Sequence, residues 1–156
     1  MAEPSRRYAR FFPYLDRYVQ LELRDDVLVR VSFPDDPEDD AGEDHPVLDR
    51  IGDYVTGTVS VDFHDVSVDL DPETEPGRIL GAVRAIPYGE SATVEDVARE
   101  IPDFDPDDEA SLTTIREALF ANPMPLIIPD HRVRDAPSAA PPRVEQRLRS
   151  VEQAGV

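Results

Sequence analysis

The chain has 156 residues, with 34 acidic and 16 basic side chains, a formal net charge of −18 and no cysteine. This length suffices for a buried core in one domain or in two small domains packed together. Without cysteine the chain has no disulfide, no thiolate metal site and no thiol nucleophile. Residues 1–20 contain no apolar leader region, and the apolar runs elsewhere are too short for a membrane span, so we expect a soluble cytoplasmic protein.

The charge pattern has two parts. Every basic side chain is arginine, and a lysine-free, strongly acidic chain resembles proteins of organisms that keep molar salt in the cell, so we predict a halophilic protein with a solvated acidic surface. Residues 110–156 differ from the rest because they hold six arginines and five acids. This part could face a polyanion, although pairing with the protein's own carboxylates is the simpler explanation.

The N-terminal half predicts a small antiparallel sheet covered by a helix. Residues 18–33 alternate around Asp25 and Asp26, which is typical of a β-hairpin with one buried face. That face is expected to contain Val19, Leu21, Leu23, Val27, Val29, Val31 and Phe33. Residues 35–44 are mostly acidic and predict a solvated loop, and residues 45–55 have helical apolar spacing. Two extended segments are expected after this helix, at residues 56–63 and 65–71.

The sequence of the C-terminal half predicts helices. Residues 76–86 predict a first helix with a buried side formed by Ile79, Leu80, Val83 and Ile86. Thr93 and Asp96 make a capping box for residues 94–101, and residues 111–122 predict the next helix. Two short helices in succession suggest a helix-turn-helix, here with a long acidic connection.

Three segments, "AVRAIPYGE", "ANPMPLIIP" and "HRV", follow one another within residues 78–133. In this order and spacing they resemble the alkylguanine-DNA alkyltransferases, also called methylated-DNA–protein-cysteine methyltransferases. Four residues of that family's proline-cysteine-histidine-arginine-valine motif are present, namely Pro129, His131, Arg132 and Val133. The resemblance implies an α+β (α/β) fold. Residues 1–72 would form an N-terminal domain with a small antiparallel sheet and a helix, and residues 73–156 a winged helix-turn-helix domain of the DNA-binding type.

The resemblance also implies a role in DNA repair. The family's winged helix enters the minor groove, flips an alkylated guanine out of the stack and moves the alkyl group onto the cysteine. A histidine oriented by a glutamate favours the reactive thiolate. By position, His131 corresponds to the histidine, Glu152 to the glutamate and Asn122 to a hinge asparagine, while Asp130 stands where the nucleophile would be.

Asp130 changes what this site can do. A carboxylate is a poor nucleophile toward an alkyl ether carbon, so transfer of the cysteine type is excluded. An aspartyl ester that forms and then hydrolyses is one alternative. A divalent metal held by Asp130, His131 and Glu152 is another, although we expect neither metal nor cofactor.

The residues that this chain shares with the family motif also have a purely structural interpretation. His131 is expected to be a hydrogen-bonded core residue, Asn122 to cap the C-terminus of a helix, and the run from Met124 to Ile128 to be a core strand. The loop after Val133 contains no glycine and is shorter than in the family, so we expect a reduced lesion pocket.

The positions that would contact DNA also depart from the family. Thr113 stands where the family has an arginine finger, and Arg116 is the nearest arginine. The candidate DNA contacts are Thr113, Arg116, Arg132 and Arg134. Val94 replaces a tyrosine that contacts phosphate. Charge and bulk replace small residues on the second helix at Glu117, Leu119 and Phe120.

Two hypotheses of function follow. The first is an alkyltransferase-like protein that recognises alkylated guanine in double-stranded DNA without transfer, and passes the lesion to a repair partner. The second is a family member that has lost DNA binding and acts as a protein-interaction or regulatory module. A surface lined by Arg116, Arg132 and Arg134 would favour the first, whereas acids or self-packing on the second helix would favour the second. We expect a monomer in either case.

Overall fold

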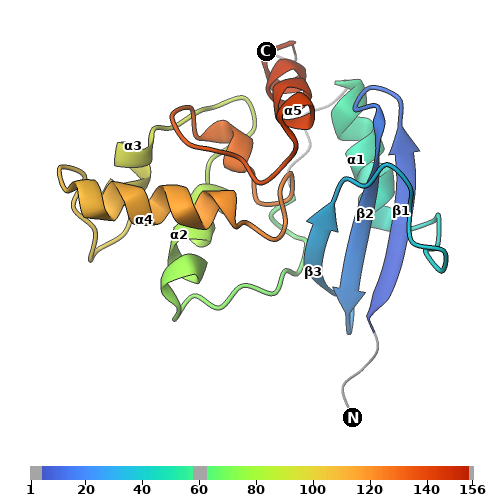
Figure 1. The fold of residues 1–156 in the computed structure, drawn as a ribbon, viewed down its shortest axis with the longest axis horizontal. Coiled ribbons are helices and arrows are strands. Elements are labelled where there is room, and N and C mark those ends of the chain that lie inside the picture. Colours follow the sequence, from blue (N-terminus) through green and yellow to red (C-terminus); the bar gives the residue numbers. More distant parts are fainter. Residues whose placement is uncertain (1–4, 58–62, 155–156) are drawn as a thin grey trace.

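A computed structural model describes residues 5–57 and 63–154. The first half contains an antiparallel sheet with strand order β1-β2-β3, formed by Arg6–Phe12, Arg17–Arg24 and Val27–Ser32. The helix α1, Pro46–Thr56, lies beside the sheet and contacts β1 (Figure 1). The predicted small sheet with a covering helix is therefore confirmed.

The predicted β-hairpin is confirmed, but its buried face is partly wrong. Asp25 and Asp26 form the turn with φ of 53° and 63°, and positive φ at both central residues matches the right-handed twist of the strands. A bulge between Glu22 and Leu23 shifts the register of β2 against β3. As a result Leu28 is buried, while its two neighbours in the chain are partly exposed.

The predicted extended segment at residues 65–71 is wrong as a strand of the sheet. Within this segment Val68 alone pairs with the sheet, through a single parallel bridge to Leu28. The chain then turns, because Asp71 accepts the backbone N–H of Glu73 at 2.9 Å. Residues 58–62 of the other predicted segment lie outside the described residues. The sequence prediction also omits β1, whose arginines interrupt its alternation.

The second half is helical, as predicted. Its α-helices are α2 (Glu75–Arg84), α3 (Val94–Arg99), α4 (Glu109–Phe120) and α5 (Pro142–Ala154). The predicted capping box on α3 is present, since the side chains of Thr93 and Asp96 each accept the other's backbone N–H. The first three of these helices pack together away from the sheet, and α5 lies beside α1 (Figure 1). Among the described helices, none combines the length and the apolar run that a membrane crossing requires.

The run that leads to Asp130 is part of the core but is not the predicted strand. Its buried side chains are Met124, Leu126, Ile127 and Ile128. Prolines at 123, 125 and 129 lack the N–H that a strand interior needs. The backbone instead closes a tight turn in which Leu126 has φ of 81° and the N–H of Ile128 donates to the carbonyl of Met124 at 2.8 Å. This turn presents Asp130–Arg132 in one turn of 3-10 helix, η1.

Candidate functional site

The carboxylate of Asp130 is enclosed by hydrogen-bond donors. Its Oδ2 accepts from Asn122 Nδ2 at 3.0 Å and from the backbone N–H of Ala139 at 2.9 Å, and its Oδ1 accepts from the hydroxyl of Ser138. Asp130 is fully buried. We call these four residues, Asn122, Asp130, Ser138 and Ala139, the Asp130 cluster. All the donors in this cluster are neutral.

The carboxylate of Glu152 is also buried, but its partners differ. Its Oε2 contacts His131 Nε2 and accepts from the hydroxyl of Tyr54, and its Oε1 accepts from Arg132 Nε at 2.8 Å and from the N–H of Gly89 at 3.1 Å. We call these five residues the Glu152 cluster. It joins α1, the segment between α2 and α3, η1 and α5.

The two carboxylates have opposite pKa shifts. Burial raises the pKa of Asp130, and the hydrogen bonds from Ser138, Ala139 and Asn122 offset it only in part. Burial also acts to raise the pKa of Glu152, but the hydrogen bonds and charges of His131 and Arg132 lower it to about 2. Glu152 is therefore an anion at neutral pH. The pKa of Tyr54 is raised well above its ordinary value by burial and by the negative charge of Glu152, so its hydroxyl stays a donor.

The enclosure of Asp130 limits its chemistry. A nucleophilic carboxylate needs a free lone pair directed at the reacting carbon and space for the substrate on that side. Here the oxygens of Asp130 accept three hydrogen bonds and the side chain is inaccessible. A flipped nucleobase could contact the carboxylate of Asp130 only if the segment around Ser138 moved away.

The predicted structural residues are in part as expected. His131 is a buried, hydrogen-bonded residue, and its Nδ1 has no partner among the described residues. The expectation that Asn122 caps a helix is wrong. Its side-chain oxygen accepts from the N–H of Met124 at 3.0 Å, and its amide donates to the carbonyl of Ile128 at 3.1 Å and to Asp130. It holds together the proline-rich turn that follows α4.

The candidate DNA contacts are not brought together on one surface. Arg132 is 5% exposed, because it is paired with Glu152 and its guanidinium donates to the carbonyl of Ile86. Thr113 is exposed on α4, and Arg116 is partly exposed on the same helix, where it donates to the carbonyl of Asp135. Arg134 is exposed just beyond η1. Arg116 and Arg134 are thus accessible, whereas Arg132 is a core residue.

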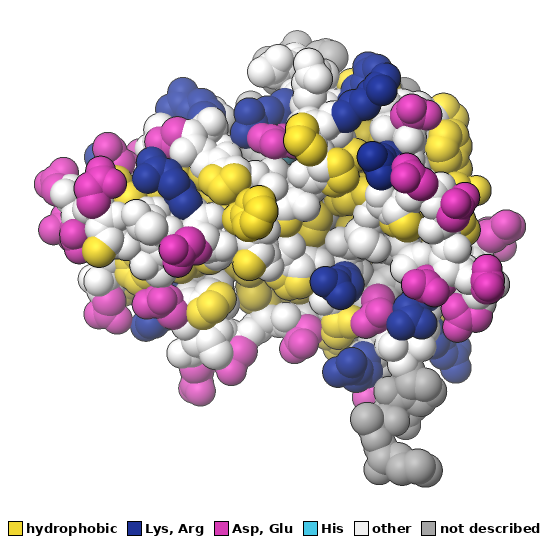
Figure 2. All heavy atoms as spheres, in the orientation of Figure 1, with side chains coloured by type: hydrophobic (Ala, Val, Ile, Leu, Met, Phe, Trp, Pro, Cys, Tyr) yellow, Lys and Arg dark blue, Asp and Glu magenta, His cyan; other side chains and the backbone are white. Residues whose placement is uncertain are grey.

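The outer face of α4 is mixed in character. Its exposed side chains follow one stripe, Glu109, Ala110, Thr113, Glu117 and Phe120, and its inner face buries Leu112, Ile115 and Leu119. Acidic side chains crowd the end of the molecule where α3 connects to α4, and hydrophobic side chains gather over the other end of α4 (Figure 2). The acids at the first end disfavour close approach of phosphates, so a nucleic acid would fit the second end better.

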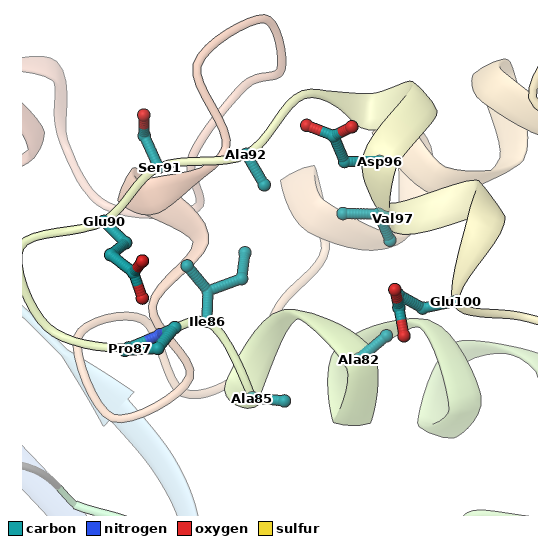
Figure 3. Close-up of a pocket in the computed structure, with 10 residues that line it drawn as sticks. All are labelled: Ala82, Ala85, Ile86, Pro87, Glu90, Ser91, Ala92, Asp96, Val97 and Glu100. Atoms are coloured by element: carbon teal, nitrogen blue, oxygen red, sulfur yellow. The ribbon is translucent and has the colours of Figure 1, made fainter.

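Two cavities lie near the Glu152 cluster. One of about 220 Å³ is lined by His131 and Glu152, and by Arg134 and Arg149. The other, of about 430 Å³, lies between the end of α2, the following segment and α3, with an apolar floor and three acids around it, Glu90, Asp96 and Glu100 (Figure 3). Asp130 lines neither cavity. The second cavity is a poor site for phosphate because of its acids.

The metal alternative finds no support in the part of the chain that the structure describes. There, no group of three or more histidine, aspartate or glutamate side chains is placed to hold a metal ion. Arg132 occupies one oxygen of Glu152, and the donors around Asp130 fill its oxygens. A cation would have to displace these partners.

Sequence reasoning missed several members of the two clusters. Tyr54 looked like an ordinary apolar position of α1, yet its hydroxyl reaches Glu152, 98 residues along the chain. Ser138 lies in a loop whose lack of glycine predicted a reduced pocket, but nothing in its sequence indicated that the hydroxyl turns back onto Asp130. Gly89 belongs to the "PYGE" segment, and its N–H contributes to the Glu152 cluster.

Comparisons with known proteins agree on one family. Residues 76–151 match the family model of the 6-O-methylguanine DNA methyltransferase DNA-binding domain. The crystal structure of Mycobacterium tuberculosis O6-methylguanine methyltransferase is similar with a TM-score of 0.76 and 20% identity, covering 98% of this chain and 95% of that chain. The Mycobacterium tuberculosis OGT in complex with DNA is similar with a TM-score of 0.73 and 19% identity, over 97% and 94% of the two chains.

A third similar structure comes from an archaeon. The O6-methylguanine-DNA methyltransferase of the hyperthermophile Pyrococcus kodakaraensis has a TM-score of 0.67 and 13% identity, over 94% of this chain and 98% of that chain. At these identities the likeness establishes the fold. No curated protein matches the chain by sequence.

Proposed function

We propose that the chain is a member of the 6-O-methylguanine DNA methyltransferase family, whose DNA-binding domain its residues 76–151 match, and that it recognises alkylated guanine in duplex DNA without transferring the alkyl group. The observation that carries the second half of this proposal is the enclosed carboxylate of Asp130. We interpret a buried carboxylate that accepts three hydrogen bonds as a structural element. The protein would then bind a lesion and leave its removal to a repair partner.

The DNA-binding half of the proposal rests on the fold and on the accessible arginines. A relative of the same fold is known in complex with DNA. The helix pair α3 and α4 is present, and Arg116 and Arg134 are available to phosphates near the C-terminal end of α4. Base flipping places the flipped nucleotide in a pocket. Here such a pocket would require the loop around Ser138 to open.

A binding titration tests this function. Fluorescence anisotropy is measured in molar potassium chloride with paired duplexes that differ by one O6-methylguanine. We expect tighter binding of the methylated duplex. Equal binding of the two duplexes would contradict recognition of the lesion but would support DNA binding. No binding of either duplex would contradict both lesion recognition and DNA binding.

A chemical test addresses Asp130 directly. After incubation with methylated duplex, the intact mass of the protein is expected to be unchanged, and no demethylated guanine is expected in the DNA. A methyl adduct on wild-type Asp130 would overturn the non-catalytic assignment and establish the ester mechanism.

Two observations favour a second function. The exposed stripe of α4 includes Glu117, which repels phosphate, and Arg132 is buried in the core. These features fit a module that binds a protein in place of DNA. The titration above separates the two functions, since this module would bind neither duplex at any salt concentration.

A further inference from the structure

Phe120 is the most exposed large hydrophobic side chain among the described residues. It is 69% exposed, whereas the next, Phe11, is 44% exposed and packs edge-on against Tyr18 with ring centroids 5.4 Å apart. Phe120 has no such ring contact within the described part of the chain. Leaving a phenyl ring in water forgoes the free energy that its burial would release. Phe120 ends α4, and hydrophobic side chains gather over that end of the helix (Figure 2), so the ring belongs to a patch that suggests a binding role.

The backbone around Phe120 is held rigidly. Phe120 is the last residue of α4, and it lies between Leu119, which is fully buried, and the turn held by Asn122. The side chain of Asn122 connects that turn to Met124, Ile128 and Asp130 through three hydrogen bonds. The Asp130 cluster therefore serves as the support for this end of α4. A ring on such a support loses little conformational entropy when it binds.

The surroundings of Phe120 fit DNA at this end of the helix. Thr113 lies on the same stripe, about two helical turns earlier, and its side chain is too short to enter a base stack. Arg116, one turn before Phe120, lies close to Asp135 in the loop that carries Arg134. Both arginines are accessible to phosphates. Glu117 opposes them and lowers affinity.

We infer that Phe120 inserts between stacked bases when α4 lies against the duplex. Proteins that bind the minor groove commonly place an apolar wedge, phenylalanine included, into a base step and unstack it. Phe120 is a positioning residue in this role, since it opens the stack and reacts with nothing. The inference rests on the proposed DNA binding.

The test compares variants at Phe120 with a matched control. Duplexes carry the fluorescent base 2-aminopurine next to the methylated guanine, and both the dissociation constant and the base fluorescence are measured. Wild type is expected to raise the fluorescence, because unstacking relieves quenching. Phe120→Ala is expected to weaken binding about tenfold and to abolish the rise. Phe120→Trp is expected to restore both, and Phe11→Ala is expected to behave as wild type.

The outcomes separate this inference from the proposed function. If wild type and Phe120→Ala bind with equal affinity and equal fluorescence, the wedge is wrong and DNA binding stands. If Phe120→Ala binds weakly but wild type leaves 2-aminopurine unchanged, Phe120 is only a surface contact and the wedge is again wrong. If wild type binds no duplex, both proposals fail and the ring is left for a protein partner. Equal thermal unfolding of all four proteins shows that the changes are local.

Discussion

Asp130 and Glu152 are buried carboxylates, and each accepts several hydrogen bonds, yet their pKa values move in opposite directions. Asp130 accepts from an amide, a hydroxyl and a backbone N–H. Glu152 accepts from a guanidinium, and it contacts an imidazole. The difference lies in the charge of the donors and not in their number.

This comparison explains why the two clusters tolerate change differently. Neutral donors replace the hydrogen bonds of water but do not cancel the cost of moving a charge into the protein interior. Cationic donors offset that cost by direct attraction. In the Glu152 cluster the carboxylate is paired with a cation, so removing it leaves Arg132 buried without a counter-charge. In the Asp130 cluster neutral protein groups donate the hydrogen bonds that water would otherwise donate to the carboxylate.

The largest effect is expected from Glu152→Ala. The substitution leaves the guanidinium of Arg132 buried without its counter-charge, and breaking a buried pair costs about 3–5 kcal/mol of unfolding free energy. Denaturant unfolding measures the loss. Glu145→Ala removes the partner of Arg149 in the same helix, a pair whose side chains are 20% and 36% exposed, and is expected to cost about 0.5 kcal/mol. If the two variants lost equal stability, the buried pair would have no special role.

Asp130→Ala is expected to have a smaller effect at neutral pH. It leaves the donors of Asn122, Ser138 and Ala139 unpaired, which costs about 1–3 kcal/mol, but it also removes a carboxylate that burial disfavours. The same unfolding experiment applies, with the exposed Asp53→Ala as the control. A loss greater than that of Glu152→Ala would contradict the contrast between the two clusters.

The pH dependence of these two losses is expected to have opposite signs. The pKa of Glu152 falls from 4.5 to about 2 on folding, so its contribution is complete above the unfolded pKa and disappears as the pH falls through about 2. The loss of stability caused by Glu152→Ala should therefore shrink between pH 4.5 and 2.

The pKa of Asp130 is raised above 3.8, so protonation of this carboxyl favours the folded protein. The loss caused by Asp130→Ala should grow as the pH falls. Unfolding free energies of both variants are measured across this pH range. If the two losses of stability changed with pH in the same direction, the opposite pKa shifts of Asp130 and Glu152 would be wrong.

The smallest effects are expected from the neutral donors. Ser138→Ala and Tyr54→Phe each remove one hydroxyl, at a cost of about 0.5–1.5 kcal/mol. Their effects on the carboxylates should differ. Ser138→Ala should raise the pKa of Asp130 further, whereas Tyr54→Phe should leave Glu152 ionised because Arg132 remains. Carboxyl chemical shifts in an NMR titration measure both values, and a protonated Glu152 at pH 5 in Tyr54→Phe would count against the dominance of the cation.

Local sequence signals predicted most of the helices. Caps and apolar periodicity act within a few residues, and so the capping box at Thr93 and the buried faces of α1 and α2 follow from the chain itself. The two failures have different causes, a missing distant partner and local prolines. Residues 65–71 have a strand pattern but separate from the sheet after one bridge to Leu28, and the apolar run after Asn122 turns because prolines interrupt it.

The site was predictable only where a known motif covers it. The resemblance placed His131 and Glu152 in one relay, and the structure brings these side chains into contact. Their roles in function stay predictions. The closure of Ser138 onto Asp130 and the reach of Tyr54 to Glu152 depend on loop path and helix packing. Arg132 looked like a phosphate ligand because surface and core arginines have the same sequence signature.

The hydrogen bond from the hydroxyl of Tyr54 to Glu152 joins residues 1–72 to residues 73–156, the two segments that we propose as domains. Glu152 lies in the last helix, so either half expressed alone would expose an incomplete polar network to water. The N–H of Val31 likewise donates to the carbonyl of Pro123 at 2.9 Å. The two halves should therefore melt as one cooperative unit. A duplex that binds α4 should then slow amide exchange in the sheet as well as in the helices.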